Sequence, residues 1–198
     1  MNSWSDAYDS KPPWDVGHPQ FAIVELVFNN ELRPGKVLDL GCGTGQNTIF
    51  LAENGFDAIG VDISPEAISL ARENAKEIGV SVGFRVGDVL RLSRYFPAHS
   101  FDAIIDSGLF HILSDDDRWT YVRQIHRVLK ENGRYYLLCF SEKEQSRAGP
   151  RRVSKAEIDT VFGKHFKINY IADTLFESAL HVGGAKAYLV SATRLEGK

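Results

Sequence analysis

The feature that most constrains this chain is a strand-like apolar run that leads into a glycine-rich turn. The run Lys36–Leu40 is followed by Gly41, Gly43 and Gly45, and a helix-like segment begins at Gln46. Glycine is needed where a backbone takes a positive φ or lies close to a ligand. This order of strand, turn and helix predicts the first unit of a parallel sheet, with a ligand bound at the turn.

Strand-length apolar runs alternate with helical patterns along most of the remaining chain. The predicted strands are residues 36–40, 57–62, 82–86, 101–106, 134–140, 165–172 and 186–192. The predicted helices are residues 19–30, 46–53, 65–78, 115–131 and 154–162. The first five strands are continuously apolar, which is typical of parallel strands covered on both faces. We therefore expect an α/β fold with a Rossmann-like seven-stranded sheet.

Local signals mark the ends of several elements. Ser64 and Ser114 are predicted N-caps, and Ser154 forms a capping box with Glu157. The pair Gly183-Gly184 is expected to connect the last two strands. In the helix 115–131, apolar residues at helical spacing predict a core-facing stripe. Its members are Trp119, Val122, Ile125, Val128 and Leu129.

Composition narrows the classes of function. With 198 residues, 43% of them hydrophobic, the chain can bury one core without a disulfide or a metal. Cys42 and Cys139 are far apart, which argues against a disulfide or zinc site and favours the cytoplasm. A net charge of -3 gives no excess of basic residues to bind a phosphate backbone, which argues against a nucleic-acid partner. We expect no signal peptide and no membrane span, because no apolar run approaches the roughly 20 residues that cross a bilayer.

The glycine turn alone does not decide between nucleotide-like ligands. The dinucleotide fingerprint would place its third glycine at position 46, where this chain has Gln46. A carboxylate at Asp39 would repel a pyrophosphate but could attract the ammonium of an amino-acid moiety, directly or through water. These two residues disfavour a nicotinamide-dependent oxidoreductase, which stays an alternative.

The pattern Asp39-x-Gly41-x-Gly43-x-Gly45 resembles the first motif of class I S-adenosylmethionine-dependent methyltransferases. The resemblance covers residues 36–141. It implies S-adenosylmethionine as the cofactor, with Asp39 and the three glycines at its binding site. It also implies the strand order 3-2-1-4-5-7-6, with the last strand antiparallel and helices on both faces.

Further cofactor positions of this family match the chain in order. The resemblance implies that Asp62 binds both ribose hydroxyls, that Ile63 packs against adenine, and that Asp88 lies toward the adenine amine. The segment 101–107 matches the fourth-strand motif beneath the reactive methyl. The cofactor-binding residues implied beyond the first motif are Asp62, Ile63, Asp88, Val89, Asp106 and Ser107.

The segment before the first helix resembles the Trp-Asp-x-Gly element of the thiopurine, thiol and halide methyltransferases. Here Trp14 would close over the cofactor and acceptor, where cation–π attraction is worth about 0.5–2 kcal/mol, or would anchor the arm by packing. Trp4 and Tyr8 could join the same lid. Residues 1–198 are thus expected to form a single methyltransferase domain, with an N-terminal arm and helix (1–35) as lid and a core (36–198).

The acceptor is expected to be a small molecule, because the chain is barely longer than the core fold. The runs 108–111 and 149–153 resemble small bacterial methyltransferases that act on heterocyclic toxins. His111 is the candidate general base, or a packing residue. His18, Phe110 and Arg152 are candidate substrate contacts. No metal is expected, and the protein is expected to be a monomer or a homodimer.

These observations predict an enzyme that transfers a methyl group from S-adenosylmethionine to a thiol or chalcogen, or to a hydroxyl or nitrogen of an aromatic heterocycle. Alignment and desolvation can supply most of the acceleration of such a displacement, so no catalytic residue is obligatory. A non-catalytic regulatory protein that binds S-adenosylmethionine is therefore the main alternative.

Overall fold

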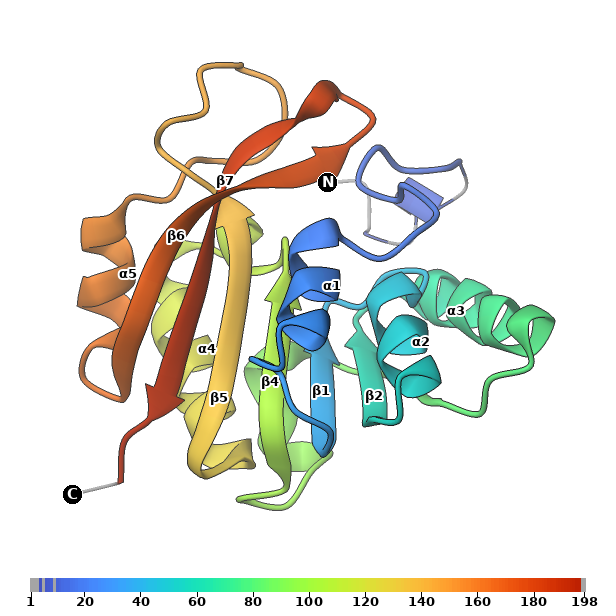
Figure 1. Ribbon diagram of the computed structural model, residues 1–198, viewed down its shortest axis with the longest axis horizontal. Coiled ribbons are helices and arrows are strands. Elements are labelled where there is room, and N and C mark those ends of the chain that lie inside the picture. The colour runs from blue at the N-terminus through green and yellow to red at the C-terminus, as the bar shows by residue number, and fades with distance from the viewer. Residues whose placement is uncertain (1–3, 5, 9, 197–198) are drawn as a thin grey trace.

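One mixed sheet forms the centre of the structure (Figure 1). The computed structural model describes residue 4, residues 6–8 and residues 10–196. Within that part of the chain the sheet has seven strands in the order β3-β2-β1-β4-β5-β7-β6. Strands β1 to β5 pair in parallel, and β7 runs antiparallel to both of its neighbours. The predicted fold class, strand order and antiparallel last strand are confirmed.

The sequence gives clear signals for most of the elements. The strands are β1 Lys36–Leu40, β2 Asp57–Asp62, β3 Gly83–Val86, β4 Phe101–Ser107, β5 Leu129–Phe140, β6 Phe166–Ser178 and β7 His181–Arg194. The helices are α1 Phe21–Phe28, α2 Gln46–Glu53, α3 Pro65–Ile78, α4 Asp115–Val128 and α5 Lys155–Phe162. Short 3₁₀ turns are η1 Asp6–Tyr8, η2 Val89–Arg94 and η3 Phe110–Ile112. No helix in the described part of the chain is long and apolar enough to cross a membrane.

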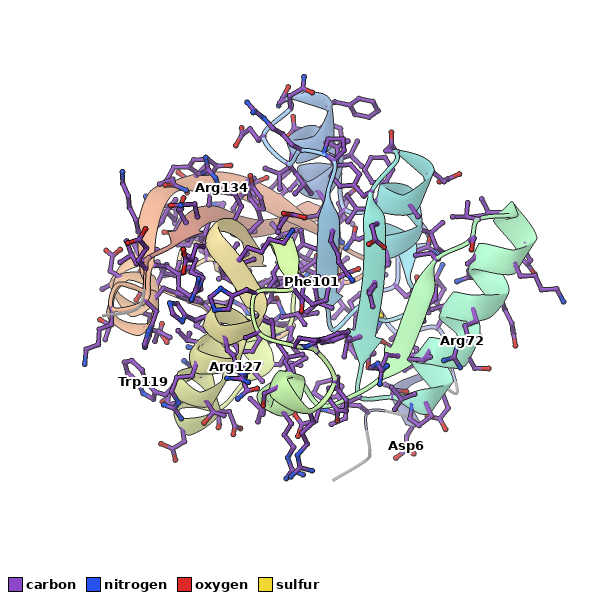
Figure 2. All side chains as sticks on the ribbon, turned by 90° about the horizontal axis from the view of Figure 1, so that it is seen from below. Asp6, Arg72, Phe101, Trp119, Arg127 and Arg134 are labelled. Carbon is purple, nitrogen blue, oxygen red and sulfur yellow. The ribbon has the colours of Figure 1, made fainter. Side chains whose placement is uncertain are left out.

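The sheet separates two apolar layers, because successive strand side chains point to opposite faces. Leu38 and Leu40 of β1 pack in the layer that α4 and α5 cover. Val37 of β1 and Ala103 of β4 pack in the layer that α1 and α2 cover. Figure 2 shows side chains filling both layers, with Phe101 in the interior.

Two predictions for α4 are wrong: the residue at which the helix ends, and the packing of Trp119 in the core. The helix ends at Val128 rather than at residue 131, because Leu129 pairs with Phe101 and joins the sheet. The carbonyls of Arg127 and Val128 accept hydrogen bonds from the backbone of residues 99 and 100. Trp119 is 39% exposed instead of packing in the core, and Figure 2 shows it on the outer surface.

The glycine pair also has a different role from the one predicted. Ser178 pairs with His181, so the connection between β6 and β7 is a two-residue turn at positions 179–180. Gly183 and Gly184 lie inside β7, and both have positive φ. Glycine inside a strand is typical of a bulge, and the β6–β7 register shifts beside this pair.

Candidate functional site

A cavity of about 620 Å³ lies at the carboxyl edge of the parallel strands. This is the edge at which open α/β sheets bind ligands. The predicted site residues that line the cavity are Trp14, His18, Gly41, Gly43, Asp62, Ile63, Asp88, Val89, Ser107 and His111. Asp39, Gly45, Asp106, Phe110 and Arg152 are not in its lining.

The glycine turn between β1 and α2 forms the floor of one half of the cavity. Gly41, Gly43 and Gly45 have φ of +67°, +53° and +83°. These values lie in the left-handed region that favours glycine. A Cβ atom at Gly45 would lie 2.7 Å from the ring of Phe84. Conformation and space therefore both require glycine at Gly45.

Asp62 is held by the two turns that flank it. Its Oδ2 accepts a hydrogen bond from the backbone N–H of Gly43 at 2.9 Å, and its Oδ1 accepts one from Ser64 at 2.9 Å. Burial raises the pKa of this carboxyl, and the backbone hydrogen bonds oppose the rise. Each carboxylate oxygen can accept another hydrogen bond, so Asp62 can bind a ligand without releasing either turn.

Asp39 lies beneath the glycine turn and is 1% exposed. Its Oδ2 accepts a hydrogen bond from the hydroxyl of Thr48 at 2.6 Å. Burial raises its pKa to about 7, helped by the negative charges of Asp106 and Asp62. Because Asp39 does not line the cavity, its charge would act on a ligand through the turn rather than by direct contact.

We expect Asp39→Asn to remove part of the pH dependence of stability. The pKa of Asp39 is about 7 in the folded protein and 3.8 without the fold, so stability falls as pH rises between these values. His111, with a pKa lowered from 6.5 to about 3, has the opposite effect, but only below 6.5. In urea unfolding between about pH 6 and about pH 8, the wild type should lose on the order of 1 kcal/mol more than the variant.

The amide of Asp39→Asn can still accept the hydrogen bond from Thr48, so the variant changes charge more than packing. Asp57→Asn is the matched control, because Asp57 is the exposed first residue of β2, at the edge of the sheet opposite to the cavity. Equal pH dependence in the wild type and Asp39→Asn would contradict the assignment of this titration to Asp39.

Asp106 supports the cavity wall from below. Its Oδ1 accepts hydrogen bonds from the backbone N–H groups of Leu109 and Phe110, at 2.9 and 3.2 Å. Its Oδ2 accepts hydrogen bonds from the hydroxyls of Tyr121 and Tyr135, at 2.6 and 3.2 Å. Burial raises the pKa of Asp106 to about 6. These four contacts fix the segment after β4, which continues into the cavity wall.

Aromatic rings form the second half of the cavity. The ring of His111 lies 5.1 Å from that of Phe140 and 5.8 Å from that of Phe176. All three residues line the cavity, and Leu180 from the β6–β7 turn adds an aliphatic surface. Burial lowers the pKa of His111 to about 3, helped by the positive charge of Arg152. The imidazole is therefore neutral at physiological pH.

The N-terminal arm lies beside the β6–β7 turn (Figure 1), and Pro13 and Trp14 of the arm line the cavity. The indole N–H of Trp14 donates to the hydroxyl of Tyr8 at 3.3 Å. The backbone N–H of Ala179 donates to the carbonyl of Pro13 at 2.8 Å. The side-chain amide of Gln20 exchanges two hydrogen bonds with the backbone of Glu177, both at 2.9 Å. The arm and the hairpin thus form one continuous wall.

Two predicted substrate contacts lie elsewhere. Phe110 is fully buried in the core, with the guanidinium of Arg118 4.1 Å from its ring centroid. Arg152 donates hydrogen bonds to the carbonyls of its own loop, at Ser146, Ala148 and Pro150. Both side chains are occupied by internal contacts, so we do not retain them as substrate contacts.

Several residues that build the site carried no functional prediction. Tyr121, Tyr135 and Arg118 hold the segment after β4, and Gln20 joins the arm to the hairpin. The tyrosines could have been flagged, because a buried Tyr hydroxyl needs a partner. Arg118 could not, since it follows three aspartates at the start of α4, where charged residues are usually exposed.

The charged side chains among the described residues that line the cavity are all acidic. Four aspartates are in its lining: Asp15, Asp62, Asp88 and Asp117. No lysine or arginine is among the described residues that line it. This favours a ligand with a positive charge and disfavours a polyanion. A cationic sulfonium compound whose ribose hydroxyls donate to Asp62 fits these carboxylate acceptors.

Comparisons with known proteins agree with this geometry. Residues 37–133 match a family model described as a methyltransferase domain. The chain is 34% identical to 2-heptyl-1-hydroxyquinolin-4(1H)-one methyltransferase of Mycobacteroides abscessus, over 82% of this chain and 72% of that protein. It is 28% identical to "Probable thiol methyltransferase 2" of Arabidopsis thaliana, over 92% of this chain and 80% of that protein. A structure described under "Conversion of a Disulfide Bond into a Thioacetal Group during Echinomycin Biosynthesis" has a TM-score of 0.89 and 28% identity, and covers 98% of this chain and 92% of its own.

Proposed function

Because this chain belongs to the methyltransferase family and is an enzyme of that class, we propose that it methylates a small, flat heteroaromatic molecule, with S-adenosylmethionine as the methyl donor. The accepting atom would be a hydroxyl oxygen, a nitrogen or a thiol sulfur of that molecule. The observation that carries this proposal is the cavity, which joins an acidic, glycine-lined half to an aromatic half.

The acidic half would hold the cofactor. Asp62 has free acceptor capacity for ribose hydroxyls, and Ile63 is 54% exposed beside it, where it could cover an adenine ring. Asp88 lines the same half, and its Oδ1 accepts a hydrogen bond from the backbone N–H of Leu90, which orients the carboxylate. When bound, S-adenosylmethionine supplies a methyl carbon on a positively charged sulfur, which a nucleophile displaces. The aspartates would stabilise that positive charge.

The aromatic half would hold the acceptor. Phe140, Phe176 and Leu180 offer apolar surface, and His111 is the polar side chain among them. Ring-to-ring packing suits a flat acceptor. The relative from Mycobacteroides abscessus is named for a hydroxyquinolone, which has this shape and one ring hydroxyl. We propose the same chemical class for this chain.

The arm, residues 1–35, would act as the lid of a single domain whose core is residues 36–198. Its hydrogen bonds to the β6–β7 hairpin, through Pro13 and Gln20, would close the cavity over both ligands. Closure excludes water and aligns the acceptor, and these two effects can supply most of the acceleration in a methyl transfer. This proposal requires no nucleophilic side chain.

We expect the purified protein to transfer a labelled methyl group from S-adenosylmethionine to 1-hydroxyquinolin-4(1H)-ones and to heteroaryl thiols. Phosphoethanolamine is the control acceptor, because it is not aromatic and its anionic phosphate would have no arginine or lysine partner among the described residues that line the cavity. Transfer is measured by extraction of labelled product, and calorimetry with S-adenosylhomocysteine measures the cofactor site.

Binding of S-adenosylhomocysteine without transfer to any aromatic acceptor would overturn the enzymatic proposal and favour a non-catalytic binding protein. Binding of NADH in place of S-adenosylhomocysteine would favour the oxidoreductase alternative. Faster transfer to phosphoethanolamine than to the aromatic acceptors would overturn the proposed acceptor class.

A further inference from the structure

The hydrogen bond at His111 determines which ring nitrogen carries the proton. The backbone N–H of Phe140 donates to Nδ1 of His111 at 3.1 Å, and both groups are buried. A backbone N–H can only donate, so Nδ1 must offer its lone pair. In a neutral imidazole the single ring proton then lies on Nε2.

The second ring nitrogen of His111, Nε2, is available to a ligand in the cavity. His111 lines the cavity between Phe140 and Phe176. Gly108 keeps this atom uncovered, because a Cβ at that position would lie 3.5 Å from Nε2 and 3.0 Å from the ring of Phe176. Gly108 also has a φ of +91°, which favours glycine. The aromatic half therefore contains one N–H donor in a largely apolar surface.

We propose that His111 binds the methyl acceptor as a hydrogen-bond donor and does not remove its proton, so that the acceptor must enter already ionised. This inference rests on the proposed methyl transfer and adds to it the protonation state of the acceptor. It replaces the sequence-based hypothesis of a general base, since a nitrogen that carries a proton cannot accept another.

The step balances without a base. The acceptor gives its proton to solvent before it binds, and its lone pair forms the new bond to the methyl carbon. The carbon–sulfur bond breaks with its electron pair on sulfur, so the negative charge of the acceptor and the positive charge of the sulfonium both disappear. No proton remains to be removed.

The substrate class follows from this requirement. It comprises flat molecules whose accepting heteroatom is acidic enough to be ionised near neutral pH, such as an N-hydroxy heterocycle or a heteroaryl thiol. Simple phenols, with a pKa near that of tyrosine, are too little ionised, and alcohols are weaker acids still.

The groups around His111 support a neutral ring. Phe140 from β5, Phe176 from β6 and the backbone of Gly108 carry no charge. Arg152, from the loop after β5, is the charged group that influences it, and its positive charge opposes protonation. A single anionic atom can be accommodated between the Nε2–H and a sulfonium, whereas a polyanion would lack partners in the described lining.

The first test reads the tautomer directly. In protein labelled with ¹⁵N-histidine, the nitrogen–proton correlations of His111 should show Nε2–H and an unprotonated Nδ1 at neutral pH. The chain has six histidines, and the resonance that is missing from His111→Asn identifies the right one. A proton on Nδ1, or an imidazolium, would overturn the proposal whatever the activity.

The second test separates the two ends of the ring with a matched pair of variants. His111→Asn places an oxygen near Nδ1 and keeps the bond from Phe140, but it removes the cavity donor. His111→Gln places an amide N–H near Nε2 and loses the internal bond. We expect kcat/KM for a 1-hydroxyquinolin-4(1H)-one to fall about 10- to 100-fold in His111→Asn and less than about tenfold in His111→Gln. The reverse order would mean that His111 acts only through packing.

The third test is the pH profile of kcat/KM for two hydroxyquinolones whose hydroxyl pKa values differ through a ring substituent. We expect each profile to rise with pH and to level off at the pKa of that acceptor. A base at His111 would instead give a flat profile that falls above the same pKa. Absence of S-adenosylhomocysteine binding in the wild type would defeat the proposed function itself, whereas binding and transfer with a falling profile would defeat only this inference.

Discussion

Asp62→Ala should weaken the binding of S-adenosylhomocysteine by about 10- to 100-fold, as expected for the loss of hydrogen bonds to a charged group. Asp62 lies at the end of β2 with one oxygen bound to Gly43 and the other to Ser64. The substitution therefore removes the ligand contact and also releases the glycine turn. Calorimetry measures the affinity, and the free energy of unfolding in urea shows how much of the loss comes from the fold.

Asp62→Asn separates these two effects, because one amide oxygen can still accept a backbone N–H while the negative charge is gone. Its affinity should lie between those of the wild type and Asp62→Ala. Asp57→Ala is the control, since Asp57 is exposed at the other end of the same strand. An unchanged affinity in Asp62→Ala would contradict the placement of the cofactor in the acidic half of the cavity.

The sequence predicted the first two strand–turn–helix units residue for residue, because their signals are local. Ser64 accepts a hydrogen bond from Ala67 as the N-cap of α3, and Gly79 ends that helix in the left-handed conformation. The end of α4 has no such signal. It depends on β4, whose Phe101 pairs with Leu129, and a contact of this kind is invisible to a pattern within one segment.

The two halves of the cavity differ in the same way. In the acidic half, the positions of Asp62 at the end of β2 and Asp88 after β3 were predictable, since parallel strands end at one edge of a sheet. The residues of the aromatic half were not predictable, because adjacent residues there point to opposite sides. In η3, Phe110 points into the core and His111 lines the cavity. That choice depends on Arg118, which holds the carbonyl of Phe110 from a different element.

Of the substitutions proposed for this protein, Arg118→Ala should therefore lower the free energy of unfolding most. The Arg118 side chain is 1% exposed and donates to Glu157 at 2.7 Å and to the carbonyl of Phe110 at 3.1 Å. Arg118→Ala removes a large buried side chain and leaves the carbonyl of Phe110 without this donor, and the two losses together cost about 3–5 kcal/mol. For a chain of this length we expect the Tm to fall by about 10 °C. The acceptor KM should rise as well, because η3 loses a contact that orients His111, while the affinity for S-adenosylhomocysteine should change little.

Arg151 provides a matched control, because it donates to the same Glu157 oxygen at 2.5 Å but is 39% exposed. An exposed ion pair contributes about 0–1 kcal/mol, so Arg151→Ala should leave the Tm within a few degrees of the wild type. Equal losses from the two arginine variants would mean that Glu157, rather than burial of Arg118, determines the effect. Arg118→Met distinguishes charge from volume: if packing alone determines the stability, this variant should restore most of it but not the acceptor KM, since methionine has no donor for the carbonyl of Phe110.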